Sequence, residues 1–195
     1  MTKPIVVIQG HPDSRGGHFG HALAQAYREG AEEAGHKIEL IEVARLDFPL
    51  LQNEEDWKTG APSEAIGEAQ KLLARAKHWV IIYPLWLGGM PAILKAFFEQ
   101  ILRPGFAITP LEGGKRWQRH LRGKSARIVV TMGMPALLYR WYFGAHSLKS
   151  LERNILGFCG IAPIKESLIG MVASMSDSKR EKWLEKMREL GRSGQ

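Results

Sequence analysis

The chain has 195 residues, of which 45% are apolar, and its 27 basic and 20 acidic side chains give a net charge of +7. This composition predicts a single domain, residues 1–195, with a sizeable core. No apolar run approaches the roughly 20 residues of a membrane helix, and an apolar run starts at Pro4. We therefore expect no export signal, no integral membrane segment and a cytoplasmic location. The single Cys159 excludes an internal disulfide and a cysteine-rich metal site, and we expect it in the core.

The positive charge favours anionic partners. Many of the basic side chains lie just before an apolar run, at Lys115, Arg116, Arg119, Arg122, Lys124 and Arg127. A solvated loop, a site for a cofactor phosphate and a nucleic-acid surface are the alternatives for this cluster. Since no helix-turn-helix, RNP or zinc-finger pattern is present, we do not expect a nucleic-acid partner.

Short apolar runs alternate with amphipathic helical stretches along the chain. The runs predict strands at residues 5–8, 38–41, 79–83, 128–130 and 165–169. Helices are predicted at residues 19–34, from a Ser63 cap to 76, from Pro91 to about 102, at 147–158 and from about 176 onward. Pro91 is expected as the first helical residue, because its missing N–H is one that a helix start leaves unbonded.

Strands that are apolar throughout and alternate with helices predict a parallel sheet covered on both faces. Five such strands favour the doubly wound order 2-1-3-4-5. In that order the ligand lies beyond the carboxyl ends of the strands, where the winding reverses between the first and third. The loops that begin at Gly10, Pro84 and Met132 are therefore the candidates for a site.

The loop at residues 10–18 leads directly into the first helix. A helix start offers unbonded N–H groups and the positive end of the helix dipole, which suit a phosphate. Gly16 and Gly17 permit close approach to the backbone, while His11 and His18 can donate hydrogen bonds. The dinucleotide-binding glycine pattern and the Walker pattern are both missing, so a phosphate site of another kind and a long turn with incidental histidines stay open.

The second loop reads YPLWLGGMP over residues 83–91 and places large apolar side chains in an irregular segment. A flat apolar ring such as the isoalloxazine of a flavin would cover them, with backbone N–H groups on its polar edge. Stacking would provide most of the affinity and the backbone would set the orientation. The alternative is that Trp86 lies at a subunit contact or in the core.

The third loop begins at residues 131–133 and is followed by an aromatic segment, residues 139–143, and by His146. This density of aromatic side chains suits a pocket wall for a planar substrate or second cofactor, and it suits a dimer interface equally. Tyr139 and His146 are also compatible with ordinary packing and capping. No catalytic triad, metal-ligand spacing or paired-carboxylate signature stands out, which hydride transfer tolerates because a flavin carries the chemistry.

Several residue blocks occur in a fixed order. The most specific is Pro84-Leu85 followed by Pro91-Ala92-Ile93-Leu94-Lys95, and the others are Gly10-His11-Pro12 with Phe19, Phe98-Glu99, Gly105-Phe106-Ala107, Leu121-x-Gly-Lys124, Thr131-x-Gly133 and Phe158-Cys159-Gly160. Together they resemble the NAD(P)H:quinone reductase branch of the flavodoxin-like proteins, the DT-diaphorase type. The resemblance covers most of the chain and implies an α/β fold, a flavodoxin-like three-layer sandwich with a five-stranded parallel sheet of order 2-1-3-4-5, and a homodimer.

The resemblance further implies a flavin, FAD or FMN, with NAD(P)H as cosubstrate and no metal. The cofactor-binding residues that it implies are His11, Gly17, His18, Phe19, Pro84, Leu85, Trp86, Leu87, Gly88, Thr131, Met132, Gly133 and Tyr139. His11, His18 and Phe19 would lie near the phosphates or ribose, residues 84–88 against the ring, and Thr131 and Gly133 along its other edge. Tyr139 and His146 are the implied catalytic residues, because in the family a tyrosine and a histidine help to accommodate charge on the reduced flavin. Tyr139 matches the family spacing and His146 is one residue further along.

The chain departs from the family pattern in three places. Trp86-Leu87 replaces the usual Gln-Trp, Gly133-Met134-Pro135 replaces a two-glycine turn, and Ile108 and Pro110 replace the tyrosines of the quinone pocket. These departures leave the electron acceptor open.

The leading hypothesis is an enzyme that passes hydride from NAD(P)H through flavin N5 to a quinone or similar acceptor. The alternative is an ancillary or regulatory flavoprotein, such as a redox sensor of a membrane transporter, with little turnover of its own. A small electron-carrying flavodoxin fits less well, because those proteins are usually acidic and have a Thr/Ser-rich phosphate loop.

Overall fold

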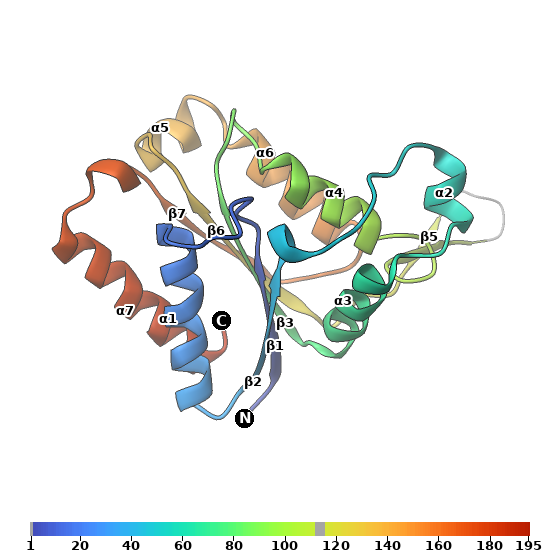
Figure 1. The fold of residues 1–195 in the computed structure, drawn as a ribbon, viewed down its shortest axis with the longest axis horizontal. Helices are drawn as coiled ribbons and strands as arrows, with labels where there is room; N and C mark the ends of the chain where they lie inside the picture. The colour runs from blue at the N-terminus through green and yellow to red at the C-terminus, as the bar shows by residue number, and fades with distance from the viewer. Residues whose placement is uncertain (1, 112–115) are drawn as a thin grey trace.

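The computed structural model describes residues 2–111 and 116–195. Five parallel strands form one sheet in the order β2-β1-β3-β6-β7 (Figure 1). Their bounds are β1 (Pro4–Gln9), β2 (Lys37–Glu42), β3 (His78–Pro84), β6 (Ser125–Thr131) and β7 (Ile164–Ile169). When these five strands are numbered along the chain the order is 2-1-3-4-5, so the predicted doubly wound sheet is confirmed.

Helices cover both faces of the sheet. Figure 1 shows α1 (Phe19–Glu33) and α7 (Asp177–Ser193) on one side, with α3 (Glu64–Arg75) and α4 (Ala92–Ile101) on the other. The α4 face also receives α6 (His146–Lys149) and the π-helical η2 (Ser150–Gly157), which continue one another and supply Leu148, Leu151 and Leu156 to that core. The predicted three-layer α/β sandwich is thereby confirmed.

The two cores divide each strand by alternate residues. Val6, Ile81 and Ile128 face the α3 and α4 side, whereas Ile5 and Val80 face the α1 and α7 side. Because side chains of a strand point to opposite faces in turn, a strand buried on both faces must be apolar at consecutive positions. This requirement explains why the strands appear in the sequence as continuous apolar runs.

Two glycines let α1 and α7 touch through their backbones. A Cβ added at Gly30 would lie 2.0 Å from the Arg188 carbonyl oxygen, and one added at Gly191 would lie 2.1 Å from the Tyr27 carbonyl oxygen. No side chain can shift to relieve such backbone contacts, so these positions require glycine for the observed helix spacing.

Several short elements were not predicted. They are η1 (Val43–Arg45), α2 (Glu54–Thr59), the hairpin of β4 (Ile108–Pro110) and β5 (Trp117–Arg119), α5 (Ala136–Trp141) and η3 (Val172–Ser174). Each is too short to show a hydrophobic period. In α2, for example, no residue is buried, and the helix is held by the Asn53 cap and three acidic residues in its first turn. Pro91 stands just outside α4 rather than as its first residue.

The basic cluster before β6 is not a single solvated loop. The buried Lys124 ammonium donates to the Ala74 and Ala76 carbonyl oxygens at 2.6 Å each, at the end of α3. Arg127 is buried within β6 and donates to Ser167 Oγ at 2.9 Å. Of the remaining members, Arg116, Arg119 and Arg122 are exposed, and Lys115 lies outside the described residues.

Cys159 is buried as predicted, and burial raises the pKa of its thiol to about 11. Within residues 2–111 and 116–195, no helix combines the length and the hydropathy that crossing a membrane requires.

Candidate functional site

Three loops meet at the carboxyl edge of the sheet, as the strand order predicts. Backbone hydrogen bonds continue the sheet ladder into all three. The Gly10 N–H donates to the Ile82 carbonyl oxygen at 2.8 Å, the Leu85 N–H to that of Thr131 at 2.8 Å, and the Met132 N–H to that of Ile169 at 2.9 Å. The three loops therefore start from fixed, adjacent positions.

The loop after β1 is closed by the side chain of Gln9, the last residue of that strand. Its Oε1 accepts the His11 N–H at 3.0 Å, and its Nε2 donates to the Gly20 carbonyl oxygen at 2.9 Å. Gln9 is almost completely buried. One amide thus ties the start of the loop to the first turn of α1.

His11 is the buried histidine of this loop. Its Nδ1 accepts the Asp13 N–H at 3.0 Å, which leaves the proton of the neutral ring on Nε2. Burial, and then the neighbouring His18 and His21, lower the pKa of His11 to about 4. At neutral pH the ring is therefore an uncharged donor at Nε2.

An internal ion pair occupies the exposed tip of the loop. The Asp13 carboxylate accepts two bonds from the Arg15 guanidinium at 2.9 Å each and one from His18 Nε2 at 3.1 Å. The Arg15 hydrogen bonds and then His18 hold the pKa of Asp13 well below its usual range. The His18 ring also stacks on His11, with centroids 3.9 Å apart and an interplanar angle of 17°. Two donors of anion-binding type thus converge on one carboxylate.

Two glycines leave room beside this ion pair. Gly16 and Gly17 have φ of 81° and 79°, and a Cβ added to either would meet no atom within 4 Å. The N–H groups of Phe19 and Gly20, at the start of α1, have no acceptor among the described residues. The Phe19 ring lies beneath the Arg180 guanidinium at 5.2 Å. The loop therefore offers free donors and open space next to a helix start, which suits an anion.

The loop after β3 is a tight turn made by the backbone alone. Trp86 and Gly89 exchange N–H to carbonyl hydrogen bonds of 2.9 and 2.8 Å, and the two residues between them, Leu87 and Gly88, have φ of 46° and 76°. Leu87 is fully exposed and Trp86 is 52% exposed, so Trp86 does not belong to the core. The Trp86 and His11 rings meet edge to face, with their centroids 6.1 Å apart, which joins this apolar turn to the polar loop. Pro84 and Leu85, by contrast, are half-buried.

The loop after β6 presents little but backbone. Thr131 and Met132 are buried, while Gly133 is exposed, with open space where a Cβ would lie. Of the three predicted residues here, only Gly133 offers an accessible surface for a ligand.

Tyr139 and His146 are not brought together. The buried Tyr139 hydroxyl bonds to Ser147 Oγ at 2.8 Å and accepts the Leu148 N–H at 3.3 Å, so it points into the α6 start. His146 is exposed and begins α6 after Ala145, whose φ is 48°. The sequence spacing identified both positions but not the direction of the tyrosine hydroxyl.

The residues present fit a flavin nucleotide. The unbonded N–H groups, Arg15 and His18 lie in the same short segment as Gly16 and Gly17, whose flanks are open, and the exposed Trp86 contacts His11 of that loop. Gln9, Asp13 and Arg15 were missed by the sequence reasoning. An aspartate two residues before an arginine, in a loop that leads into a helix, is the signal that could have indicated the ion pair.

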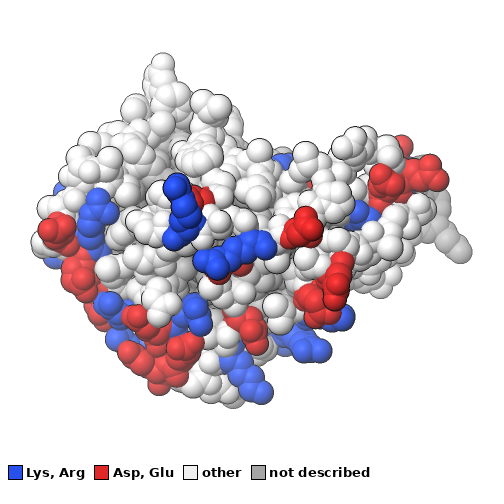
Figure 2. Space-filling view, viewed as in Figure 1, with Lys and Arg blue, Asp and Glu red and all other residues white. Residues whose placement is uncertain are grey.

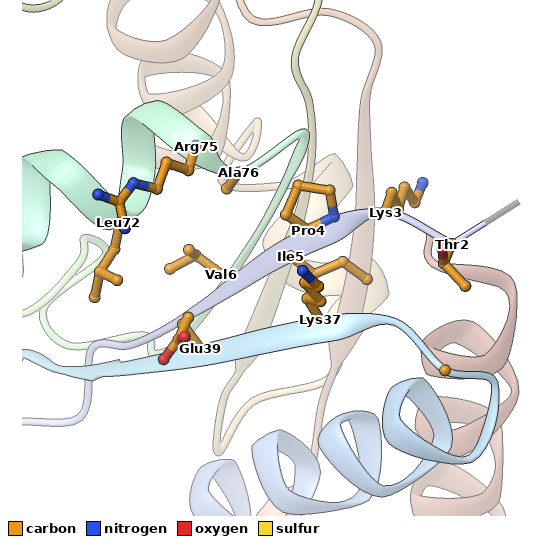
Figure 3. A pocket seen from close by; sticks show the side chains of 11 residues that line it. Thr2, Lys3, Pro4, Ile5, Val6, Lys37, Glu39, Leu72, Arg75 and Ala76 are labelled. Atoms are coloured by element: carbon orange, nitrogen blue, oxygen red, sulfur yellow. The ribbon is translucent and has the colours of Figure 1, made fainter.

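Surface charge distinguishes this edge from the rest of the molecule. In Figure 2 the top of the visible face is mostly white, and most of the blue and red side chains lie below it. A cavity of about 510 Å³ lies at the opposite, amino edge, between β1, β2 and the end of α3. Figure 3 shows its Arg75 guanidinium and Lys3 ammonium at opposite ends, with Lys37 and Glu39 between them, so charges of both signs are spread along it.

Comparison with known proteins gives a consistent set of similarities. The model of a protein family described as having a flavodoxin-like fold matches residues 3–190. The chain is 27% identical over 184 residues to an uncharacterized NAD(P)H oxidoreductase of Haemophilus influenzae, covering 92% of this chain and 90% of that protein. It is 25% identical over 184 residues to FMN-dependent NADH:quinone oxidoreductase 3 of Bacillus cereus, covering 83% of each. The structure of an NAD(P)H:quinone oxidoreductase from Methanothermobacter marburgensis superposes with a TM-score of 0.80 at 26% identity, covering 99% of this chain and 97% of that one.

Proposed function

The chain belongs to the protein family of flavodoxin-like fold, and we propose that it is a flavin-dependent NAD(P)H oxidoreductase that reduces a quinone or a similar acceptor. This membership confirms the family resemblance predicted from the sequence. Relatives named as NAD(P)H and NADH:quinone oxidoreductases support the reaction class, and the relative named as FMN-dependent favours FMN as the flavin.

One observation carries the proposal for this chain. A polar loop with converging donors, residues 10–18, lies directly beside an exposed apolar turn, residues 85–89, at the carboxyl edge of the sheet. A flavin nucleotide has the same division between an anionic phosphate and a flat ring. When bound, the flavin would accept hydride from NAD(P)H at N5 and deliver it to the acceptor.

The phosphate would be held by Arg15, His18 and the N–H groups at the start of α1. There the helix dipole and charge-assisted hydrogen bonds act in the same direction. Because Asp13 already occupies Arg15 and His18, phosphate binding would require these donors to be shared with or released from that carboxylate.

The ring would lie against Trp86 and Leu87, with the Gly133 backbone along its other edge. His146 is exposed and is the proposed donor to the bound ring or substrate. For Tyr139 the contacts with Ser147 and Leu148 favour a positioning role, in which its hydroxyl fixes the start of α6 and with it His146.

We also propose a homodimer. Trp141 and Tyr142, each 79% exposed, are followed directly by the exposed Phe143, whose ring contacts that of Tyr142. Consecutive exposed aromatic side chains of this kind are typical of protein interfaces. Light scattering at several concentrations tests this proposal: a Trp141→Glu variant should shift the mass toward the monomer, and a wild-type monomer at all concentrations would contradict it.

The enzymatic proposal is tested by purification, FMN titration and turnover. We expect visible flavin absorption in the purified protein, or its recovery after FMN is added, together with NADH or NADPH oxidation that depends on menadione. Absence of flavin binding under both conditions would contradict the proposal. Flavin binding without turnover would contradict the enzymatic part and favour the regulatory flavoprotein.

A further inference from the structure

A second concave region lies between α7, the loop after β7 and the start of α5, next to the loop after β6. It is a groove of about 660 Å³. Its apolar lining residues are Pro135, Ala136, Leu137, Met171, Met175 and Trp183, and its charged lining residues are Lys179, Lys182 and Lys186. Figure 1 shows the two elements that flank it, α5 at the top of the molecule and α7 along its left side.

The three lysines form a row along one face of α7. Their spacings of three and four residues place them on successive turns, over about 10 Å of helix. In the part of the chain that the structure describes, none of them is paired with a carboxylate. Of the four acidic residues in the same helix, Glu181 and Glu185 instead contact Arg188 and Arg192, and Asp177 and Glu189 form no ion pair with these lysines in the described structure. The groove therefore has an uncompensated cationic wall.

The rest of the groove is apolar and deformable. The Trp183 ring lies beneath the Lys186 ammonium at 4.8 Å, so this cation already rests on an aromatic face. Leu137 is 70% exposed at the rim. Methionine side chains such as Met171 and Met175 adapt to ligands of different shape, because they are unbranched and polarizable.

One lining residue is held in a strained conformation. Met171 has a φ of 58°, which is rare for a residue with a side chain. Its N–H donates to the Met134 carbonyl oxygen at 3.1 Å, and the next N–H, of Val172, donates to that of Met132 at 3.1 Å. These bonds fix the strained residue with its apolar side chain exposed in the groove, and such over-determined strain is found mainly at ligand sites.

We propose that this groove binds a small amphiphilic organic anion, a carboxylate with an apolar chain or ring. The apolar body would cover Trp183 and the two methionines, and the carboxylate would lie among the three ammonium groups. The volume falls in the range of about 300–1,000 Å³ typical of small-molecule sites, and the lining has the usual mixture of an apolar floor and a few charged groups. This site is independent of the flavin proposal, because none of the residues argued to bind the flavin belongs to it.

Laurate is the probe for the test, with the full chain kept in excess FMN so that the proposed flavin site is filled. NMR spectra of protein labelled with ¹³C at the methionine methyl groups report where laurate binds. The variants Met171→Leu and Met175→Leu assign the signals of these two residues. We expect laurate below its micellar concentration to shift the Met171 and Met175 signals in a saturable manner, and to leave that of Met90, in the loop after β3, unchanged. Dodecyltrimethylammonium, with the same chain and the opposite charge, should produce no such shift.

The variant Lys179→Glu/Lys182→Glu should weaken laurate binding by about tenfold or more, because two attractive contacts become repulsive. Lys77→Glu is the single-charge control, since Lys77 is equally exposed but lies before β3 at the amino edge. A circular dichroism spectrum and melting temperature equal to wild type establish that the variants fold. The proposal would be overturned if the cationic amphiphile bound equally well, if the double variant kept its laurate affinity, or if only the Met90 signal shifted. It would also be overturned if the protein sedimented with phosphatidylglycerol vesicles without laurate and lost this sedimentation in the lysine variant.

Discussion

The two loops that build the proposed flavin site are stabilised in opposite ways. The loop at residues 10–18 is held by side chains, with Gln9, His11 and Asp13 each bonded to its backbone or to one another. The turn at residues 85–89 is held by backbone hydrogen bonds alone and leaves Trp86 and Leu87 in solvent. The polar loop is thus fixed before a ligand binds, with its cationic donors held by Asp13, whereas Trp86 and Leu87 would gain most of their contacts from a ligand. FMN and riboflavin, which differ by the phosphate, separate the two contributions.

The largest effect is expected from Gln9→Leu. The substitution leaves the buried His11 N–H without its acceptor and removes the side-chain bond to the Gly20 carbonyl oxygen, which keeps its partner within α1. The unfolding free energy should therefore fall by about 1–3 kcal/mol. FMN affinity should fall with it, because the loop loses its closure. Urea denaturation measures the first quantity, and Gln25→Leu, on the exposed face of α1, is the control. Equal stability of both variants would show that Gln9 does not hold the loop.

Acid should destabilise the protein through its buried histidines. The pKa is lowered to about 4 for His11 and to about 3 for His78, in both cases mainly by burial, from 6.5 in the unfolded chain. Because the pKa of each histidine is lower in the folded protein, the unfolded chain binds more protons at pH values between the folded and unfolded pKa. Stability is therefore complete above pH 6.5 and falls as the pH decreases toward 4 and then 3.

Unfolding free energies measured between pH 7 and 4 test this expectation. His11→Asn keeps an acceptor for the Asp13 N–H and cannot take up the proton, so its stability should fall less steeply than that of the wild type. An unchanged slope would contradict the assignment to His11.

Trp86→Ala should weaken FMN and riboflavin equally, by about tenfold, because both ligands share the ring and aromatic contacts contribute about 0.5–1.5 kcal/mol beyond burial. Fluorescence titration measures both affinities, and Trp117→Ala on the β5 hairpin is the control. A loss confined to FMN would place Trp86 against the phosphate and not the ring.

Asp13→Asn should act in the opposite direction and on FMN alone. The neutral amide can still accept the Arg15 N–H but no longer competes with phosphate for Arg15 and His18. We expect FMN affinity to rise by about three- to fivefold, as for one exposed ion pair, and the gain to shrink in high salt. Stronger riboflavin binding, or weaker FMN binding, would contradict this role for the ion pair.

Leu87→Asn should have the smallest effect. Asparagine followed by glycine is the preferred sequence for a two-residue turn with positive φ. The free energy of unfolding should therefore rise by about 0.5–1 kcal/mol, and the melting temperature should rise slightly with it. Flavin affinity should fall only modestly because one apolar contact is lost. A lower melting temperature would contradict the assignment of strain to Leu87.

The sequence predicted the sheet well because of one physical requirement. A parallel strand covered on both faces must be apolar at consecutive positions, so the run at residues 5–8 identified β1, and the strand order then located the three loops. The short helices α2 and α5 were not predictable from periodicity, since six residues make fewer than two turns.

Within the site, the sequence identified candidate residues but not their contacts. The bonds from Tyr139 to Ser147 and from Gln9 to Gly20 depend on how loops and helices pack, for which spacing along the chain carries little information. The Asp13 ion pair with Arg15 joins residues only two apart and was within reach of the sequence. The flavin-binding roles of His11, His18 and Trp86 therefore remain predictions, and their geometry now specifies how to test them.

Calorimetric titration of the purified, flavin-free protein with FMN and with riboflavin tests the proposed flavin site most directly. FMN should bind with one site per chain and at least about tenfold more tightly than riboflavin, because two cationic donors and a helix start act only on the phosphate. Equal affinities for the two ligands, or no binding of either, would contradict it.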